Sequence, residues 1–155
     1  KKAYLTYGEV AGKTVNYVLY DLFKNYTELK AEVLGSSCFI NDGKGNFKRT
    51  DLPEPLQLAP IFSFQPVINN STGENMYVSG GNFFDVIPYE GRYDAQPLAL
   101  FKINKQGGIN YLHQPNLLSA KGQVRDIKWL RTLKYGEVMV VARNNEPLLF
   151  YSYKK

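Results

Sequence analysis

The feature that most constrains this fold is a strand–turn–strand pattern that recurs along the chain at a nearly constant interval. Short apolar segments suited to β-strands flank glycine-containing turns at residues 42–45 and 105–108. Three pairs of segments are separated by roughly 62 residues, the third to within a few residues. The pairs are residues 39–41 with 101–104, 77–82 with 139–144, and 59–62 with 124–127. A shared separation indicates that one structural unit is used more than once.

Each repeat is predicted to hold four strands. The complete unit has them at residues 60–67, 75–79, 97–103 and 108–112. Two strands within residues 36–49 precede it, and three strands at 123–130, 137–142 and 147–153 follow it. Antiparallel four-stranded units in series are the blades of a β-propeller. The expected fold is therefore mainly β, a C-terminal propeller fragment with a partial blade at 35–50, a full blade at 58–113 and a last blade at 122–155, the remaining blades lying in a longer chain.

Residues 1–34 differ in pattern and are expected to form a short α-helical segment. Apolar residues 15, 18, 19, 22 and 23 share one helical face, and Thr14 is a suitable N-cap. A similar apolar stripe precedes Gly12, and a third short turn is expected at residues 29–34. The tyrosines of this segment are expected to pack against a sheet.

Composition narrows the possible functions. The net charge is +5, but Lys and Arg are scattered singly, so nucleic-acid binding is not expected. No apolar run approaches the roughly 18 residues that a transmembrane helix needs, so no membrane insertion of this segment is expected. Cys38 is the single cysteine, in an apolar strand, and His113 is the single histidine. Neither a metal site nor a cofactor is predicted.

The richest group of polar and aromatic residues lies in the loop of residues 80–96. In a propeller blade this loop emerges on the same face as residues 50–58, 113–122 and 143–146. The candidate ligand-binding residues are Asn82, Tyr89, Arg92, Tyr93, Asp94, Arg125, Asp126, Arg143 and Asn144. Arg and Asn donate to hydroxyls or carboxylates, and tyrosine stacks on a sugar face. The ordinary interpretation is that Arg–Asp pairs, such as Asp94 with Arg125, tie the loops together.

A carbohydrate-active enzyme is the alternative. Asp85, Glu90 and Asp94 lie in the same loop, and glycoside hydrolysis uses two carboxyl groups at a defined separation. Nothing in the sequence fixes that separation. A non-catalytic binding or interaction module, with a carbohydrate or protein ligand, is therefore the favoured function.

The order and spacing of several motifs extend over about two thirds of the chain. They are residues 36–37 (SS), 41–47 (NDGKGNF), 52–53 (LP), Gln57, 59–60 (AP), 80–83 (GGNF), 91–95 (GRYDA), 122–127 (GQVRDI) and 141–145 (VARNN). With these motifs the chain resembles the C-terminal blades of bacterial FG-GAP/VCBS repeat proteins, particularly those with an ASPIC/UnbV segment. The resemblance implies a β-propeller, export to the cell envelope or outer surface, and a binding or scaffolding role.

One departure from that family concerns calcium. Its propellers often carry a loop of the form Asp-x-Asp-x-Asp-Gly-x-x-Asp between the first two strands of a blade. Placing the loop glycine on Gly73 puts Ile68, Asn70, Thr72 and Met76 at the ligand positions. None of these is a carboxylate, and the corresponding turn at residues 131–134 is cationic. Because calcium takes several oxygen ligands, we predict that neither turn binds it.

Overall fold

The computed structural model describes residues 4–67 and 75–152. The chain divides into two compact units, Lys1–Leu34 and Gly35–Lys155. The first unit contains only short helical elements, and the second contains all the described strands. The prediction of a mainly β chain with antiparallel sheets and a few short helices is therefore confirmed.

The first unit holds helices α1 (Tyr7–Val10) and α2 (Val15–Leu19) and the 3₁₀ helix η1 (Tyr20–Lys24). The Thr14 hydroxyl accepts a hydrogen bond from the Tyr17 N–H at 3.3 Å, which confirms the predicted N-cap. Neither α-helix buries any residue, and Tyr7 and Tyr17 are exposed within this unit. The packing of the tyrosines against a sheet stays a prediction. The prediction of a short turn at residues 29–34 is wrong, since this segment has no regular secondary structure. So short a segment gains too few hydrogen bonds to offset helix nucleation.

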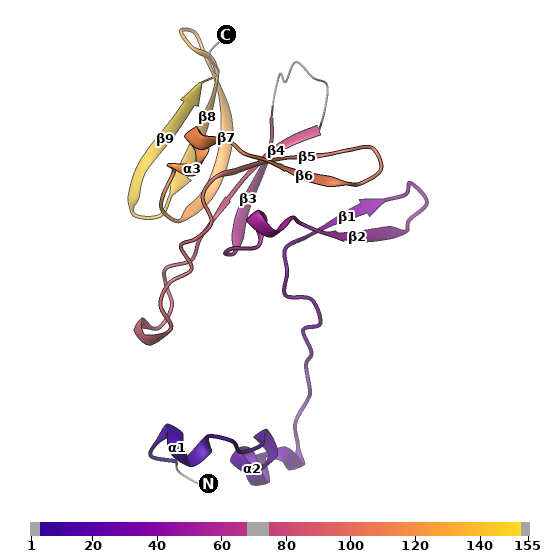
Figure 1. Cartoon of the computed structure of the whole chain (residues 1–155), viewed down its shortest axis with the longest axis vertical. Helices are drawn as coiled ribbons and strands as arrows, with labels where there is room; N and C mark the ends of the chain where they lie inside the picture. The colour runs from indigo at the N-terminus through magenta and orange to yellow at the C-terminus, as the bar shows by residue number, and fades with distance from the viewer. Residues whose placement is uncertain (1–3, 68–74, 153–155) are drawn as a thin grey trace. The chain divides into compact units, whose positions relative to one another are not determined.

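The second unit consists of three antiparallel sheets (Figure 1). Strands β1 (Ser37–Asn41) and β2 (Phe47–Asp51) form a hairpin. Strands β3 (Ile61–Pro66), β4 (Asn75–Gly81), β5 (Ala99–Ile103) and β6 (Ile109–Leu112) form a four-stranded sheet, paired in chain order. Strands β7 (Val124–Thr132), β8 (Gly136–Arg143) and β9 (Glu146–Ser152) form the third sheet. The strands lie within a few residues of their predicted positions, and the sheets are open.

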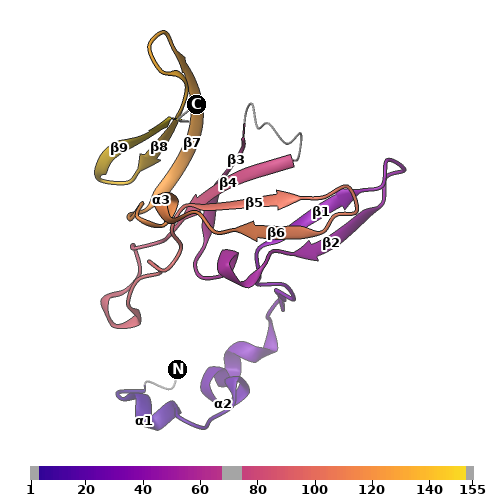
Figure 2. The same ribbon diagram turned by 45° about the horizontal axis from the view of Figure 1, so that its top comes forward.

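Both faces of the four-stranded sheet contribute side chains to an apolar cluster, because successive residues of a strand point to opposite faces. Figure 2 shows the β1–β2 hairpin beside β5 and β6. Val78 and Leu100 are cross-strand partners whose face packs against Ile127 and its neighbours on the third sheet. The adjacent pair, Tyr77 and Phe101, faces the other way, and their rings stack with centroids 5.5 Å apart. This second face packs against Cys38 of the hairpin and against Leu52 and Leu56, the latter in the 3₁₀ helix η2 (Glu54–Leu56). The core is thus divided between two apolar layers.

The two larger sheets share an irregularity at equivalent positions. Between β3 and β4 the pairing passes from Ile61↔Gly81 to Ser63↔Gly80, leaving Phe62 as a bulge. Between β7 and β8 it passes from Val124↔Arg143 to Asp126↔Ala142, leaving Arg125 as a bulge. Ser63 and Asp126 are equivalent residues next to these bulges, and each lies 63 residues from its counterpart, the interval expected from the sequence.

The same main-chain bond closes each irregularity, from Asn82 N to Pro60 O at 2.9 Å and from Asn144 N to Gln123 O at 2.8 Å. The bulged residues also meet, because the Arg125 guanidinium lies 4.3 Å from the centroid of the Phe62 ring. The Ser63 hydroxyl accepts from Ile127 N at 3.1 Å, which joins β3 to β7. The repeat is therefore a repeat of backbone geometry as well as of sequence.

Both outer faces of this three-layer arrangement carry exposed apolar side chains. On the hairpin, Phe39 and Phe47 are more than half exposed and point away from the core. On the third sheet, Leu130, Leu148 and Phe150 are exposed on the face opposite Ile127. Strand alternation normally places polar residues on a solvated face, so these faces are unusually apolar.

Candidate functional site

A cavity of about 490 Å³ lies beside the segment that links β4 to β5. This size is within the range of small-molecule sites. The linking segment includes the 3₁₀ helix η3 (Pro88–Glu90) and supplies Asn82, Phe84, Arg92, Asp94, Ala95 and Pro97 to the wall. The opposite wall comes from Leu118 at the end of helix α3 (Pro115–Leu118), from Ala120, Lys121 and Gly122, and from Glu146 at the start of β9. Three of the nine predicted site residues, Asn82, Arg92 and Asp94, therefore line one cavity.

Asn82 fixes the two walls relative to each other. It is 2% exposed and has a φ of 82°, a left-handed conformation that Asn tolerates better than most residues. Its amide donates to Gly122 O at 3.0 Å, and its side-chain oxygen accepts from Gln96 N at 2.8 Å. Its side chain thus satisfies main-chain groups from both walls, which is a structural role in the site.

Arg92 and Asp94 form an ion pair within the cavity wall. Arg92 Nε donates to Asp94 Oδ2 at 3.1 Å, and the guanidinium lies 4.6 Å from the centroid of the Phe84 ring. Residues two apart on an extended segment face the same way, which explains why these two meet. Among the described residues, the Arg92 Nη atoms have no hydrogen-bond acceptor. The pair is therefore positioned by contacts that leave donors available.

Arg125 supports the cavity without lining it. Its guanidinium donates to Asn82 O at 3.1 Å and to the side-chain oxygen of Gln123, which also accepts from Phe84 N at 3.2 Å. The predicted ion pair between Asp94 and Arg125 is wrong. Asp94 is paired with Arg92, and Arg125 is bonded to Asn82 O and to Gln123. Gln123, which is not among the candidate site residues, is the side-chain partner of Arg125 in place of Asp94.

Arg143 holds the opposite wall together. It donates to Lys121 O at 2.7 Å and to Pro147 O at 2.8 Å, and it forms an ion pair with Glu146. Its side chain is only 10% exposed, so its charge is directed to protein groups and not to the cavity. Lys121 and Glu146 line the cavity and were missed by sequence reasoning, since neither belongs to a motif.

The remaining predicted residues lie outside the cavity wall. Asp126 contacts Lys128 Nζ at 3.0 Å, and that hydrogen bond is the main reason its pKa lies below the ordinary value, with a further contribution from Ile127 N. Tyr93 pairs its main chain with Phe83, and the rings of Tyr89 and Tyr93 are exposed. Asn144 contributes the main-chain bond already described.

The three carboxylates of the enzyme alternative are not gathered at the cavity. Asp94 lines it, whereas Asp85 and Glu90 do not. Asp94 is engaged by Arg92, and no hydrogen bond or ion pair links the three residues to one another within the described ranges. Of these three residues, only Asp94 is therefore placed to act on a ligand in the cavity.

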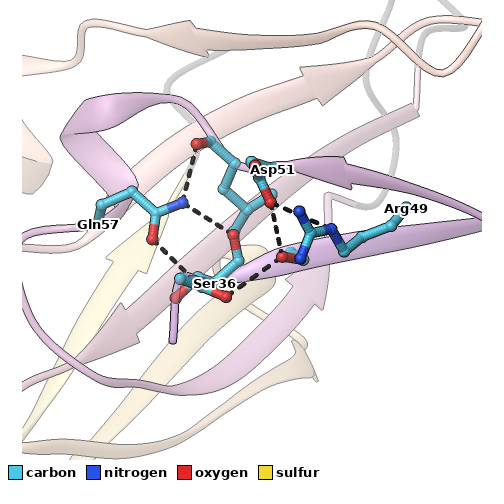
Figure 3. A network of polar contacts seen from close by, with 7 residues as sticks. Ser36, Arg49, Asp51 and Gln57 are labelled. Atoms are coloured by element: carbon cyan, nitrogen blue, oxygen red, sulfur yellow. Dashed lines mark hydrogen bonds and ion pairs between the residues drawn. The ribbon is translucent and has the colours of Figure 1, made fainter. Parts of the chain in front are cut away.

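A second polar network lies at the base of the hairpin and was not predicted as such (Figure 3). The Gln57 amide accepts from Ser36 N and donates to Ser36 O, both at 2.8 Å, and donates to Leu52 O at 2.9 Å. Asp51 accepts from the Ser37 hydroxyl at 3.0 Å and lies 3.6 Å from Arg49 Nε. The Gln57 side chain thus bonds to both main-chain groups of Ser36, as a residue on a neighbouring strand would. This is a structural role.

In the described parts of the chain, no three His, Cys, Asp or Glu side chains are grouped as metal ligands. Residues 68–74, which hold the first turn considered for calcium, lie outside the described ranges. That this turn does not bind calcium stays a prediction. None of the described helices has the length and apolar character needed to cross a membrane.

Comparisons of the chain with protein-family models, with curated proteins and with solved structures found no match.

Proposed function

We propose that this chain is a non-catalytic binding module whose ligand, a carbohydrate or a protein segment, occupies the cavity between the β4–β5 segment and Lys121. The observation that carries this proposal is the Arg92–Asp94 pair, held at the cavity wall by Phe84, while the Arg92 Nη donors have no acceptor within residues 4–67 and 75–152. Preformed cavities with a few oriented polar groups are the usual form of a ligand site.

The proposal includes a finer fold, in which the sheets are blades of a β-propeller. Two successive sheets share the same strand order, the same bulge and the same closing hydrogen bond. The first strands of these sheets, β3 and β7, contact each other, as neighbouring inner strands of a propeller do. The exposed apolar faces at Phe39 and Phe150 support further blades on both sides.

The biological setting follows from the motifs alone. We propose a secreted or cell-surface bacterial protein of the FG-GAP/VCBS type, with the remaining blades as the nearest partners of this chain. The motifs at residues 41–47, 80–83 and 122–127 carry that proposal. Sequence encoded upstream of Lys1 tests it: further repeats of about 62 residues support it, and an upstream sequence without such repeats contradicts it.

Ligand binding is tested with the chain itself on a glycan array and a peptide array, followed by calorimetry on any bound compound. Arg92→Gln is expected to weaken binding by about tenfold, the usual effect of losing charge-assisted hydrogen bonds. Arg131→Gln, which removes the same charge from the exposed end of β7, is the matched control and should leave binding unchanged. Equal binding by wild type and Arg92→Gln contradicts the proposed site.

The enzyme alternative has a separate readout. Hydrolysis of a bound glycan that disappears in Asp94→Asn, with binding retained, would favour a carbohydrate-active enzyme. Binding without turnover in the wild-type chain supports the binding module.

A further inference from the structure

Four charged residues line the cavity, the cations Arg92 and Lys121 and the carboxylates Asp94 and Glu146. Asp94 is paired with Arg92 through Nε, and Glu146 is paired with Arg143, which lies behind the wall. Lys121 also lines the cavity, and its ammonium has no carboxylate within ion-pair distance among the described residues. The Lys121 ammonium is therefore available to a ligand in the cavity.

Arg92 lines the same cavity as Lys121. Stacking on Phe84 and the bond from Nε to Asp94 fix the guanidinium plane, and neither Nη atom has an acceptor in the part of the chain that the structure describes. The fork of a guanidinium matches the two oxygens of a carboxylate, and an ammonium adds a point charge to such a site. Arg92 and Lys121 together thus offer donors suited to an organic anion.

The carboxylates of the cavity favour ligand hydroxyls near that anion. Asp94 Oδ1 and Glu146 Oε1 have no hydrogen-bond donor among the described residues, because the bonds to Arg92 and Arg143 use the other oxygen of each group. An ionised carboxylate only accepts hydrogen bonds, and hydroxyl groups are suitable donors. A ligand with one acidic group and several hydroxyls can bind both the donors of Arg92 and Lys121 and the acceptor oxygens of Asp94 and Glu146.

We infer that the cavity binds a saccharide that carries a carboxylate, a uronic-acid residue, with its acid group on Arg92 and Lys121 and its hydroxyls on Asp94 and Glu146. This inference rests on the proposed binding function and names its ligand class. It assigns to Lys121 and Glu146 roles in ligand selection that no motif indicates.

The test uses a panel of uronic-acid oligosaccharides (oligogalacturonate, oligoglucuronate and alginate oligomers), each beside its methyl ester. The ester keeps the sugar ring and removes the charge. The intact chain is expected to bind at least one acid about tenfold more tightly than its ester, as a charge-assisted pair predicts, and the preference should shrink as salt is added.

Two variants locate the preference. Within residues 4–67 and 75–152 the Lys121 side chain makes no hydrogen bond or ion pair, so Lys121→Gln should retain the fold. It should lower affinity for the acid while leaving affinity for the ester unaffected. Lys105→Gln, in the exposed β5–β6 turn, is the control for loss of one positive charge. Arg92→Gln should remove most of the remaining preference.

The outcomes separate the inference from the proposed function. Equal affinity for acid and ester, with binding still lost in Arg92→Gln, overturns the acidic-saccharide inference and leaves the binding function standing. Binding of inorganic phosphate as tightly as the best acid also overturns it, since the site would then recognise charge without the sugar. Failure of every acid and ester to bind overturns the inference together with the carbohydrate form of the function.

Discussion

Asn82 shows how much of the site depends on single side chains that bond to main-chain groups. Its replacement by alanine removes the partners of Gly122 O and Gln96 N, both in a buried environment. Asn82→Ala is expected to lower the free energy of unfolding by about 2–4 kcal/mol, the cost of leaving two such groups unsatisfied. Urea unfolding measures this. Asn144→Ala is the matched control at the equivalent repeat position, where only a main-chain bond is involved, and an equal loss in both variants would contradict the argument.

Gly122 is constrained twice, by conformation and by space. Its φ is 107°, and a Cβ placed there would lie 2.6 Å from Glu146 Oε1. Gly91 also has a positive φ, of 72°, but a Cβ there would meet nothing within 4 Å. Gly91→Ala is expected to cost about 1 kcal/mol of stability from backbone strain alone. Gly122→Ala should cost more and should also weaken ligand binding by displacing Glu146. Equal losses of stability would show that Glu146 moves aside freely.

The residues of the site could be predicted only in part. The loop motif indicated Asn82, Arg92 and Asp94, and these three residues line one cavity. The partners could not be predicted, because Arg125 and Arg143 bond mainly to carbonyl oxygens, which every residue carries. The Arg92–Asp94 pair was within reach of sequence reasoning, since i and i+2 residues share a side of an extended segment.

The β1–β2 turn is an element whose stability depends on one ionised side chain. The Asp42 carboxylate accepts from the Asn46 amide at 2.8 Å and from Lys44 N at 2.7 Å, which lowers its pKa below 3.8. A lowered pKa in the folded state stabilises the turn at any pH above 3.8, and this contribution is lost as the pH falls through the folded value. NMR titration of the Lys44 amide should give a midpoint below 3.8, and Asp42→Asn should abolish it. A midpoint at or above 3.8 would contradict the bonding pattern.

At the scale of elements, strands were predicted better than helices. Alternating apolar residues between glycine turns indicate a strand and its partner at once, so the pairs β1–β2 and β5–β6 followed from the sequence. The bulges at Phe62 and Arg125 could not be predicted from the sequence. A bulge adds one residue to a strand, and the apolar–polar alternation on each side of it still looks like that of a regular strand. The prediction of a turn at residues 29–34 was wrong because it relied on the spacing of apolar residues in a segment too short to form a helix.

The whole chain should respond to protease as two units. Residues 26–34 are exposed and have neither helix nor strand, and they contain Lys30. Trypsin is expected to cut first after Lys30, because irregular exposed segments enter a protease site most easily. Mass spectrometry should then show residues 31–155 as a stable product, and Lys30→Gln should delay it. First cleavage within β3 to β9 would contradict this division.

The exposed face of the third sheet predicts a dependence on chain length. Phe150 is 62% exposed, so Phe150→Ser should change the stability of this chain by less than about 1 kcal/mol. Val141 is fully buried on the opposite face, and Val141→Ala should cost about 2 kcal/mol. In a form extended upstream with the proposed further blades, Phe150→Ser should become destabilising as well. Unfolding in urea of both forms tests this, and an unchanged effect of Phe150→Ser in the longer form would contradict a covering blade.

Within each of the three sheets, every strand pairs with the strand next to it in the chain. Such pairing keeps the sequence separation of strand contacts lower than pairing between distant strands would, and a lower contact order favours faster folding. It also suits a chain that emerges from the ribosome one end first, since domains fold during synthesis as their parts appear. Once β6 has been made, the four-stranded sheet has all four of its strands. The bonds from Ile127 N to the Ser63 hydroxyl and from Trp129 Nε1 to Pro66 O are among those that form later, when β7 follows.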